Sequence, residues 1–378
     1  MAAPIPEHVR NIALVGQDGA GKTSLAEAML FVSGRTQRMG TTHDGKSYLD
    51  FDDEEIRRKF TISTSVAPIP FKDYKINLLD TSGHPDFIGD TIATMYAAEM
   101  AMFVVDAVDG PQVMTTKLWK EAEKMNISRS VFINHVDREN ADFGSAMALL
   151  HARFGKRLSP VTLPLGQQDD FQGVIDVVRM KARYFDKDGT SERVEDIPAD
   201  FQERADSARE RLIDAVAEAD EEIMMKYLEG EELTQEEIER CIHDAINQGV
   251  FVPVYVGSTI IKQGIQGLME DIATFFPHPR EHAAYVLADG DKVTIDETGE
   301  PAGFVFKSTS DAFVGRLSYL KVLTGVLEPG MDLVNARTGK KDRITKLLVM
   351  MGKEATEVKS AKAGDIIVIP KLDEARPS

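Results

Sequence analysis

The sequence predicts an α/β fold: a parallel sheet with helices on its faces, interrupted by an inserted α+β subdomain and followed by a small β-barrel or sandwich. In the first half, short apolar runs rich in β-branched residues alternate with segments of helical spacing, as in parallel sheets. After residue 300, short apolar runs separated by glycines favour an all-β domain. The length of 378 residues also exceeds what one core usually holds.

The strands and helices of the first domain follow one another in a regular order. Buried strands are predicted at Asn11–Val15, Lys75–Leu79, Ala101–Val105, Ser130–Ile133 and Val252–Val256. Helices are predicted between them at Thr23–Val32, Thr91–Glu99, Met114–Met125 and Gly264–Phe276. Because the prolines of Pro277-His278-Pro279 end the last helix, we place the first domain at residues 1–285 and the second at 286–378.

The insert is expected at about residues 167–250. Its first part, within Pro160–Met180, is rich in strand-forming residues. After Pro198 the period becomes helical, and one helix that ends at Gly230 is predicted from an apolar stripe at Leu212, Val216, Ala219, Ile223 and Tyr227. Thr234 and Glu237 have the spacing of a capping box, which predicts the start of the next helix.

The β-domain is expected to contain five strands. They are predicted at Phe304–Lys307, Leu317–Val322, Asp332–Asn335, Arg343–Leu348 and Asp365–Ile369. The basic turn Arg337–Arg343 lies between two of them and has the charge for contact with phosphate, although such a turn is usually only solvated.

The net charge of −18 is unevenly distributed along the chain. Residues 196–240 contain 16 acidic and 5 basic side chains, whereas residues 300–378 contain 10 acidic and 13 basic ones. The total charge therefore does not exclude contact between the second domain and RNA. The single Cys241 excludes an internal disulfide and favours a reducing compartment, and no apolar run approaches the ~20 residues of a membrane span. We expect a cytoplasmic protein that binds no membrane.

The strongest motif follows the first strand and opens the first helix. It has the pattern of a phosphate-binding P-loop and reads Gly16, Gln17, Asp18, Gly19, Ala20, Gly21, Lys22, Thr23 and Ser24. Glycines let backbone amides face the phosphates, and the helix N-terminus adds a partial positive charge. Lys22 is expected to reach the β- and γ-phosphates, and the Thr23 hydroxyl to bind Mg²⁺.

Three later segments also follow predicted strands. Asp80 is expected to hold Mg²⁺ through water, and the Gly83 amide to face the γ-phosphate. In Asn134-His135-Val136-Asp137, the Asp137 carboxylate can accept hydrogen bonds from two guanine donors that adenine does not present together, which predicts GTP and GDP as ligands. The segment Ser258, Thr259 and Ile260 is expected to line the base, with the Ser258 amide contacting the guanine carbonyl.

These motifs together resemble translational GTPases, and elongation factor G most of all. The resemblance includes Arg58–Ile62, His84-Pro85-Asp86-Phe87, Asn134–Phe143, the insert, Gly257–Pro279 and Asp311–Arg316 of the second domain. It implies that Thr61 completes the Mg²⁺ shell, that His84 positions the attacking water, and that Lys22 absorbs charge. It also implies a ribosomal partner, with the acidic insert meeting the large-subunit stalk protein and both domains meeting ribosomal RNA. We expect a monomer that does not bind DNA.

The chain departs from the family pattern at three places. The usual Asn-Lys-x-Asp has His135 in place of lysine, which puts nucleotide affinity in question. The P-loop has Gly19 where the family often has aspartate, which puts a monovalent-ion site in question. The three later domains of elongation factor G have no counterpart in these 378 residues, so we do not expect this chain to translocate. Two alternatives stay open: a non-hydrolysing GTP-dependent switch on the ribosome, and a ribosomal-protection or termination GTPase.

Overall fold

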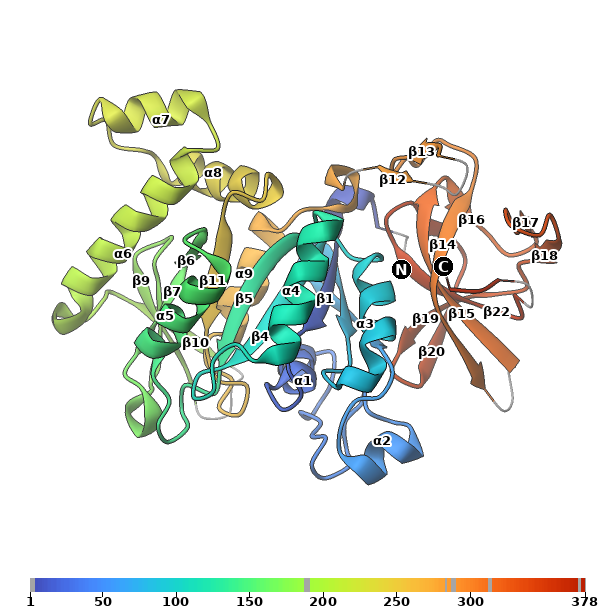
Figure 1. Cartoon of the computed structure of the whole chain (residues 1–378), viewed down its shortest axis with the longest axis horizontal. Helices are drawn as coiled ribbons and strands as arrows, with labels where there is room; N and C mark the ends of the chain where they lie inside the picture. The colour runs from blue at the N-terminus through green and yellow to red at the C-terminus, as the bar shows by residue number, and fades with distance from the viewer. Residues whose placement is uncertain are drawn as a thin grey trace.

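The computed structural model describes residues 4–186, 191–282, 284–286, 290–311, 315–372 and 375–377. Figure 1 shows a central α/β domain, an insert at its left and a β-rich domain at its right. Residues 312–314 of the resemblance motif at 311–316 lie outside the described residues. In the part of the chain that is described, no helix combines the length and apolarity needed to cross a membrane.

The central sheet carries the first domain. Its strands lie in the order β2-β3-β1-β4-β5-β11-β6, and only β2 is antiparallel to its neighbour. Their bounds are β1 Val9–Val15, β2 Ser65–Phe71, β3 Tyr74–Asp80, β4 Met100–Asp106, β5 Ser128–Asn134, β6 Leu158–Pro160 and β11 Val252–Val256. All residues of β1, β4 and β11 are buried, as expected for strands covered on both faces.

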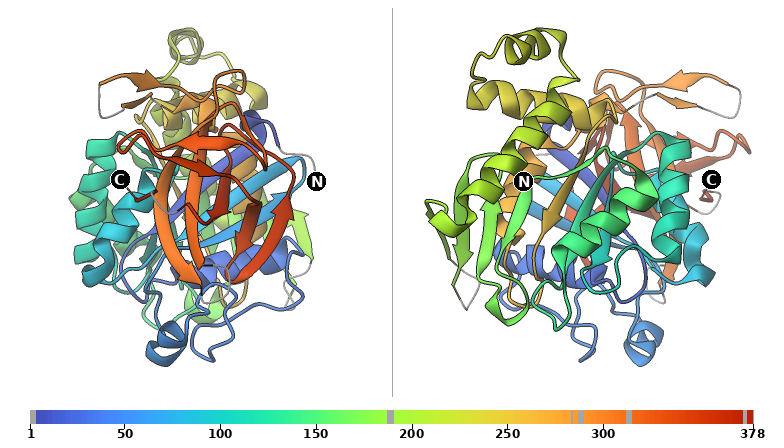
Figure 2. Two further views of the ribbon diagram at one scale, coloured as in Figure 1. Left: turned by 90° about the vertical axis from the view of Figure 1, so that its right-hand side faces the viewer. Right: turned by 60° about the vertical axis from the view of Figure 1, so that its left-hand side comes forward.

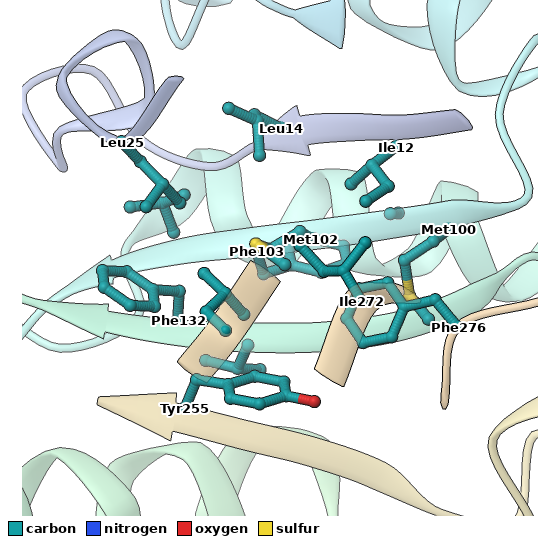
Figure 3. Packing of buried hydrophobic residues seen from close by; sticks show 14 of the residues in the cluster. Ile12, Leu14, Leu25, Met100, Met102, Phe103, Phe132, Tyr255, Ile272 and Phe276 are labelled. Carbon is teal, nitrogen blue, oxygen red and sulfur yellow. The ribbon is translucent and has the colours of Figure 1, made fainter. Parts of the chain in front are cut away.

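Helices cover both faces of this sheet. Helices α1 and α9 pack together on one face, and α3 and α4 lie on the other (Figure 1). The helices are α1 Lys22–Val32, α2 Asp53–Arg58, α3 Ile88–Met95, α4 Val113–Met125, α5 Phe143–Phe154 and α9 Ile265–Phe275. Figure 3 shows Ile272 of α9 against the sheet residues Met100, Met102 and Tyr255. This packing fixes the carboxyl ends of the strands, where the candidate site lies.

The insert contains a four-stranded antiparallel sheet and three helices. Its elements are β7 Thr162–Leu165, β8 Gly173–Asp176, β9 Lys181–Phe185, β10 Glu192–Glu195, α6 Ala199–Ala217, α7 Glu221–Leu228 and α8 Gln235–Asn247. The small sheet thus begins at Thr162, ahead of the expected boundary at 167. The predicted capping box forms at the start of α8, where Thr234 and Glu237 exchange hydrogen bonds.

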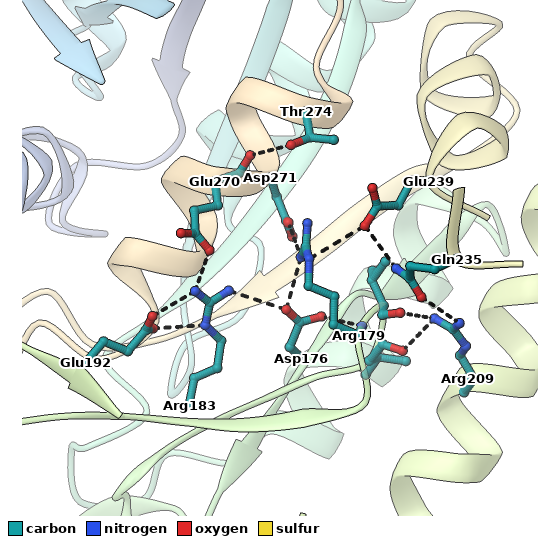
Figure 4. Close-up of polar contacts among 12 residues, drawn as sticks. Asp176, Arg179, Arg183, Glu192, Arg209, Gln235, Glu239, Glu270, Asp271 and Thr274 are labelled. Atoms are coloured by element: carbon teal, nitrogen blue, oxygen red, sulfur yellow. Dashed lines mark hydrogen bonds and ion pairs between the residues drawn. The ribbon is translucent and has the colours of Figure 1, made fainter. Parts of the chain in front are cut away.

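A buried ion network fastens the insert to α9 (Figure 4). Arg179 donates to Asp176 at 3.0 Å and to Asp271 of α9 at 2.7 Å. Arg183 pairs with Glu192 of β10 and with Glu270 of α9. Burial, reinforced by the nearby Asp176 carboxylate, raises the pKa of Asp271 to about 7. Arg179 therefore compensates two carboxylates that are costly to bury.

Two predicted helices have different bounds in the structure. The single helix expected to run to Gly230 is wrong: α6 ends at Ala217 and α7 begins at Glu221. The break arises because the Asp220 carboxylate accepts from the amides of Glu222 and Ile223 and so caps a new helix. The helix expected at Thr91–Glu99 is α3, which starts at Ile88 and ends at Met95, and the Glu99 amide instead donates to the Asn11 carbonyl of β1.

The second domain is β-rich, as predicted. A curled five-stranded antiparallel sheet has the order β14-β15-β22-β19-β20 (Figure 2, left). Its strands are β14 Ala302–Asp311, β15 Gly315–Thr324, β19 Leu347–Met351, β20 Glu354–Val358 and β22 Ile366–Pro370. Three short two-stranded ribbons accompany this sheet: β12 Tyr285–Val286 with β13 Lys292–Val293, β16 Val326–Leu327 with β21 Ala361–Lys362, and β17 Asp332–Val334 with β18 Lys341–Arg343.

The strand predicted at Arg343–Leu348 is wrong. It is divided between β18 and β19, because Ile344 exchanges backbone hydrogen bonds with the turn at Gly330 and Met331.

The two domains share buried contacts. Phe306 and Tyr319 of the second domain belong to the same apolar cluster as Ile12 of β1. Lys321 of β15 forms an ion pair with Glu99 in which both side chains are buried. Asp365 accepts from Lys75 at 2.7 Å and from Asn77 of β3 at 3.2 Å. The second domain is therefore held on the edge of the central sheet by apolar and ionic contacts together.

Candidate functional site

Segments from four strands converge at one edge of the central sheet. The P-loop follows β1, Asp80 ends β3, Asn134 ends β5, and Ser258 comes two residues after β11. These strands lie close together in the sheet and run parallel, so their carboxyl ends meet. Ligands of open α/β sheets bind at this edge. The structure thus brings together the residues that the motifs predicted.

The P-loop and its surroundings pack so closely that two positions, Gly21 in the loop and Gly83 beside it, have no room for a side chain. A Cβ on Gly21, whose φ is +94°, would lie 2.2 Å from Asn134 Nδ2. A Cβ on Gly83 would lie 2.5 Å from Lys22 Nζ and 2.4 Å from the Asp18 amide nitrogen. Lys22 donates to the Gln17 carbonyl at 3.0 Å. Burial lowers the pKa of Lys22, and the negative charge of Asp80 only partly offsets this effect. The loop therefore presents a buried cation at the backbone of Gly83.

A chain of hydroxyl groups joins the P-loop to the segment after α2. Thr23 Oγ1 lies 2.9 Å from Thr61 Oγ1, and Thr61 donates to Asp50 Oδ1 at 2.8 Å. Burial raises the pKa of Asp50. Asp50 was not predicted, because no motif marks it and only the fold brings it to Thr61.

Asp80 is the residue best suited to a cation. Its side chain is fully buried beside the Thr23 hydroxyl, and in the described residues no backbone amide donates to either carboxylate oxygen. Burial raises its pKa well above the ordinary value. A hydrated divalent cation beside Thr23 and Thr61 would compensate this carboxylate, and Mg²⁺ usually takes few protein ligands. Within the described ranges there is no group of three His, Cys, Asp or Glu side chains that would hold a metal without phosphate.

Asn134 links three of the converging segments. Its Nδ2 donates to the Ala20 carbonyl of the P-loop at 3.0 Å, and its Oδ1 accepts from the Thr259 amide at 3.1 Å. Asp137 follows on the same loop, and its Oδ1 is buried without a hydrogen-bond partner among the described residues. An unpartnered buried acceptor is costly unless a ligand supplies donors. Guanine presents such donors, so this loop has the chemistry of a base pocket.

The expected contact of Ser258 with a ligand does not fit the structure. Its amide donates to the Gln263 carbonyl at 3.1 Å, because residues 258 and 263 form an isolated β-bridge. The Thr259 amide is taken by Asn134. In the described part of the chain, the amide of Ile260 donates no hydrogen bond that would compete, and the Ile260 side chain is 56% exposed. Ile260 is therefore the member of this segment that remains for a ligand.

His84 lies between aromatic rings beside the P-loop. Its ring is stacked on Phe60 at 5.4 Å with an interplanar angle of 13°, and it is 5.7 Å from Phe87. The Asp86 amide donates to His84 Nδ1 at 3.3 Å, which places the ring proton of a neutral imidazole on Nε2. The segments that contain Thr61 and His84 therefore contact each other through Phe60.

The remaining P-loop residues occupy supporting positions. Gln17 Oε1 accepts from the Met114 amide and caps the start of α4. Asp18 and Gly19 line a cavity of about 100 Å³ with Arg138, and Ser24 lies in the first turn of α1. Glu27 of α1 was not predicted: it accepts from Gly40, Ser47 and Tyr48 and so anchors the segment before α2.

Comparisons with known proteins identify the family of both domains. Residues 7–278 match the family model of the elongation factor Tu GTP binding domain, and residues 300–376 match that of elongation factor G domain 2. A crystal structure of a Thermus thermophilus protein is 33% identical, with a TM-score of 0.88. That match covers 98% of this chain and 54% of the other. The chain therefore belongs to the elongation factor Tu GTP-binding-domain family, and its second domain is of the elongation factor G domain 2 type.

Proposed function

We propose that this chain binds GTP at the converging strand ends and hydrolyses it when it is bound to the ribosome. The observation that carries the proposal is the pairing of two features in one site. A buried cation, Lys22, lies at the P-loop end, and a buried carboxylate oxygen of Asp137 without a donor lies at the other. A guanine nucleotide satisfies both, because its phosphates are anionic and its base offers two donors.

Base recognition is assigned to the two loops that Asn134 joins. Asp137 accepts from the ring nitrogen and exocyclic amine of guanine, and the Ile260 amide donates to its carbonyl. Asn134 acts through position, since both of its side-chain groups are engaged with Ala20 and Thr259. Adenine would leave Asp137 without its donor pair, and such a mismatch is strongly disfavoured.

Phosphate binding is assigned to the P-loop and the residues around it. Lys22, which donates to P-loop carbonyls in the structure, would donate to phosphate oxygens when the nucleotide is bound. The Gly83 amide would face the terminal phosphate. Thr23, Thr61 and Asp80 would hold Mg²⁺, with Asp80 acting through water. When bound, the ion neutralises charge that develops on the phosphate oxygens.

Hydrolysis is assigned to in-line attack by water on the γ-phosphate. His84 orients the water, and its stacking on Phe60 ties its position to the segment of Thr61. Catalysis in this class comes mainly from positioning and charge stabilisation. By analogy with GTPases that lack their activating partner, turnover without the ribosome should be slow, on the order of 10⁻⁴ to 10⁻² s⁻¹.

The ribosome is the proposed partner, and the cytoplasm follows as the location. The insert offers an acidic surface on α6 to α8, and α7 also exposes Met225 and Leu228 to 57% and 72%. We assign this surface to the large-subunit stalk protein. The second domain and its basic β17–β18 turn are assigned to ribosomal RNA, and the chain is proposed to act as a monomer.

Single-turnover GTP hydrolysis with ribosomes tests the proposal. His84→Ala should lower the rate by about 10² or more while GTP affinity stays unchanged, because the ring acts on water and not on the nucleotide. His151→Ala, an exposed histidine of α5, is the matched control and should retain the wild-type rate.

Three results would change the assignment. GTP binding without turnover on any ribosomal complex would favour the non-hydrolysing switch. Equal rates for His84→Ala and wild type would remove His84 from catalysis. Stimulation confined to stalled or terminating ribosomes would favour a ribosomal-protection or termination GTPase.

A further inference from the structure

His135, Asp106 and Arg138 contact one another beside the P-loop. His135 Nδ1 lies 2.7 Å from Asp106 Oδ2, at the end of β4. Arg138 Nη1 donates to the same oxygen at 3.0 Å, and Arg138 Nη2 lies 3.3 Å from His135 Nε2. The three side chains therefore form a closed triangle of contacts.

The triangle fixes where its positive charge lies. A guanidinium can only donate hydrogen bonds, so His135 Nε2 must accept, and its proton is on Nδ1, facing Asp106. Burial by itself would raise the pKa of Asp106, but the hydrogen bonds from His135 and from the Val108 amide, together with the charge of Arg138, lower it. The cation of this corner is thus Arg138, paired with an ionised Asp106.

The triangle also directs the guanidinium toward the P-loop. His135 Nε2 would lie 3.2 Å from a Cβ on Gly21, so the ring touches the loop. Arg138 lines the same cavity as Gln17, Asp18, Gly19 and Ala20. Its side chain is 47% exposed, whereas those of His135 and Asp106 are 4% and 9% exposed. Two buried residues therefore hold one half-exposed cation beside the loop that binds phosphate.

We propose that Arg138 contacts the bound guanine nucleotide beside Gly19–Gly21, and that His135 and Asp106 position it there. The planar guanidinium can stack on the base and ribose and can donate to ligand oxygens. This role would replace that of a lysine at position 135 in the Asn-Lys-x-Asp pattern, with the charge moved three residues along the chain. The inference rests on the proposed guanine-nucleotide site.

Equilibrium binding of fluorescent GDP, with its dissociation rate, tests the inference on the full chain. Arg138→Ala should weaken affinity about tenfold, mainly through faster dissociation, as expected for a lost charge-assisted contact. His135→Lys restores the lysine of the family pattern, so adding Arg138→Ala to it should cost less than about twofold. Arg153→Ala, which removes the same charge from an exposed position on α5, should bind GDP like wild type.

The outcomes separate the inference from the proposed function. Wild type that shows no preference for GDP over ADP would overturn the proposed function and the inference with it. Guanine-selective wild type with unchanged affinity in Arg138→Ala would overturn the inference alone, as would an equal tenfold loss in the His135→Lys background. A purely structural role for Arg138 predicts such background-independent losses. If His135→Lys does not fold, Arg138→Lys should retain affinity within about threefold, and a loss as large as that of alanine would overturn the inference.

Discussion

Lys321→Met is expected to destabilise both domains, although it changes only the second. Lys321 is fully buried on β15 and pairs with the buried Glu99, which precedes β4 of the first domain. Glu99 Oε2 also accepts from Asn11 at 2.9 Å. Methionine fills a similar volume without the charge, so the substitution leaves Glu99 buried with only its neutral partner.

The expected loss follows from that uncompensated carboxylate. Breaking one side of a buried ion pair costs about 3–5 kcal/mol. For a chain of this size, 1 kcal/mol corresponds to a melting shift of about 2 °C, so the midpoint should fall by about 6–10 °C. The double variant Lys321→Met/Glu99→Gln removes both charges and should recover most of the loss.

Urea unfolding followed by tryptophan fluorescence measures this effect. The chain has one tryptophan, Trp119, which is buried on α4 of the first domain and reports only on that domain. The Trp119 transition should move to lower urea in Lys321→Met. Lys346→Met is the control, since its pair with Glu357 is 57% exposed on both sides and should contribute less than about 0.5 kcal/mol. An unchanged Trp119 transition in Lys321→Met would refute the claim that the domains stabilise each other.

Three further predictions concern stability and the P-loop. The hydrogen bond to Glu281 raises the pKa of His243 above 6.5. Their contact therefore stabilises the folded state fully below pH 6.5, and this stabilisation is lost as the pH rises through the raised pKa. In urea titrations, His243→Gln should cost more stability at about pH 6 than at about pH 9. Gly83→Ala should weaken GTP binding by tenfold or more in titrations, because its Cβ would meet Lys22. Asp220→Ala should cost about 1 kcal/mol by removing the α7 cap, as measured by thermal unfolding.

The sequence predicts the strands that are buried on both faces better than those at the sheet edges. The β1, β4 and β11 strands are continuous apolar runs, so their positions follow from composition. The edge strand β2 was not predicted because Pro68 and Pro70 interrupt it, and prolines are tolerated only at edges and bulges. The break between α6 and α7 was not predicted because the apolar stripe continues across it. The break depends instead on the Asp220 side chain, which caps the start of α7.

The candidate site could be predicted as far as its motifs extend. Lys22, Asp80, Asn134 and Asp137 follow strands in recognisable patterns, and the sheet brings them together. Asp50 and Glu27 lie in no pattern, and their roles depend on the path of residues 40–61 over α1. The Ser258 amide was assigned to a ligand because a sequence does not show which amides the chain satisfies by itself.

Base selectivity in Asp137→Asn tests the central claim most directly. The carboxylate that accepts from guanine becomes an amide that can donate to the carbonyl of xanthine at the same position. Wild type is predicted to prefer GDP over XDP by about a hundredfold or more, and the variant to reverse that order. Unchanged GDP affinity in Asp137→Asn, or wild type that binds ADP as tightly as GDP, would contradict the account.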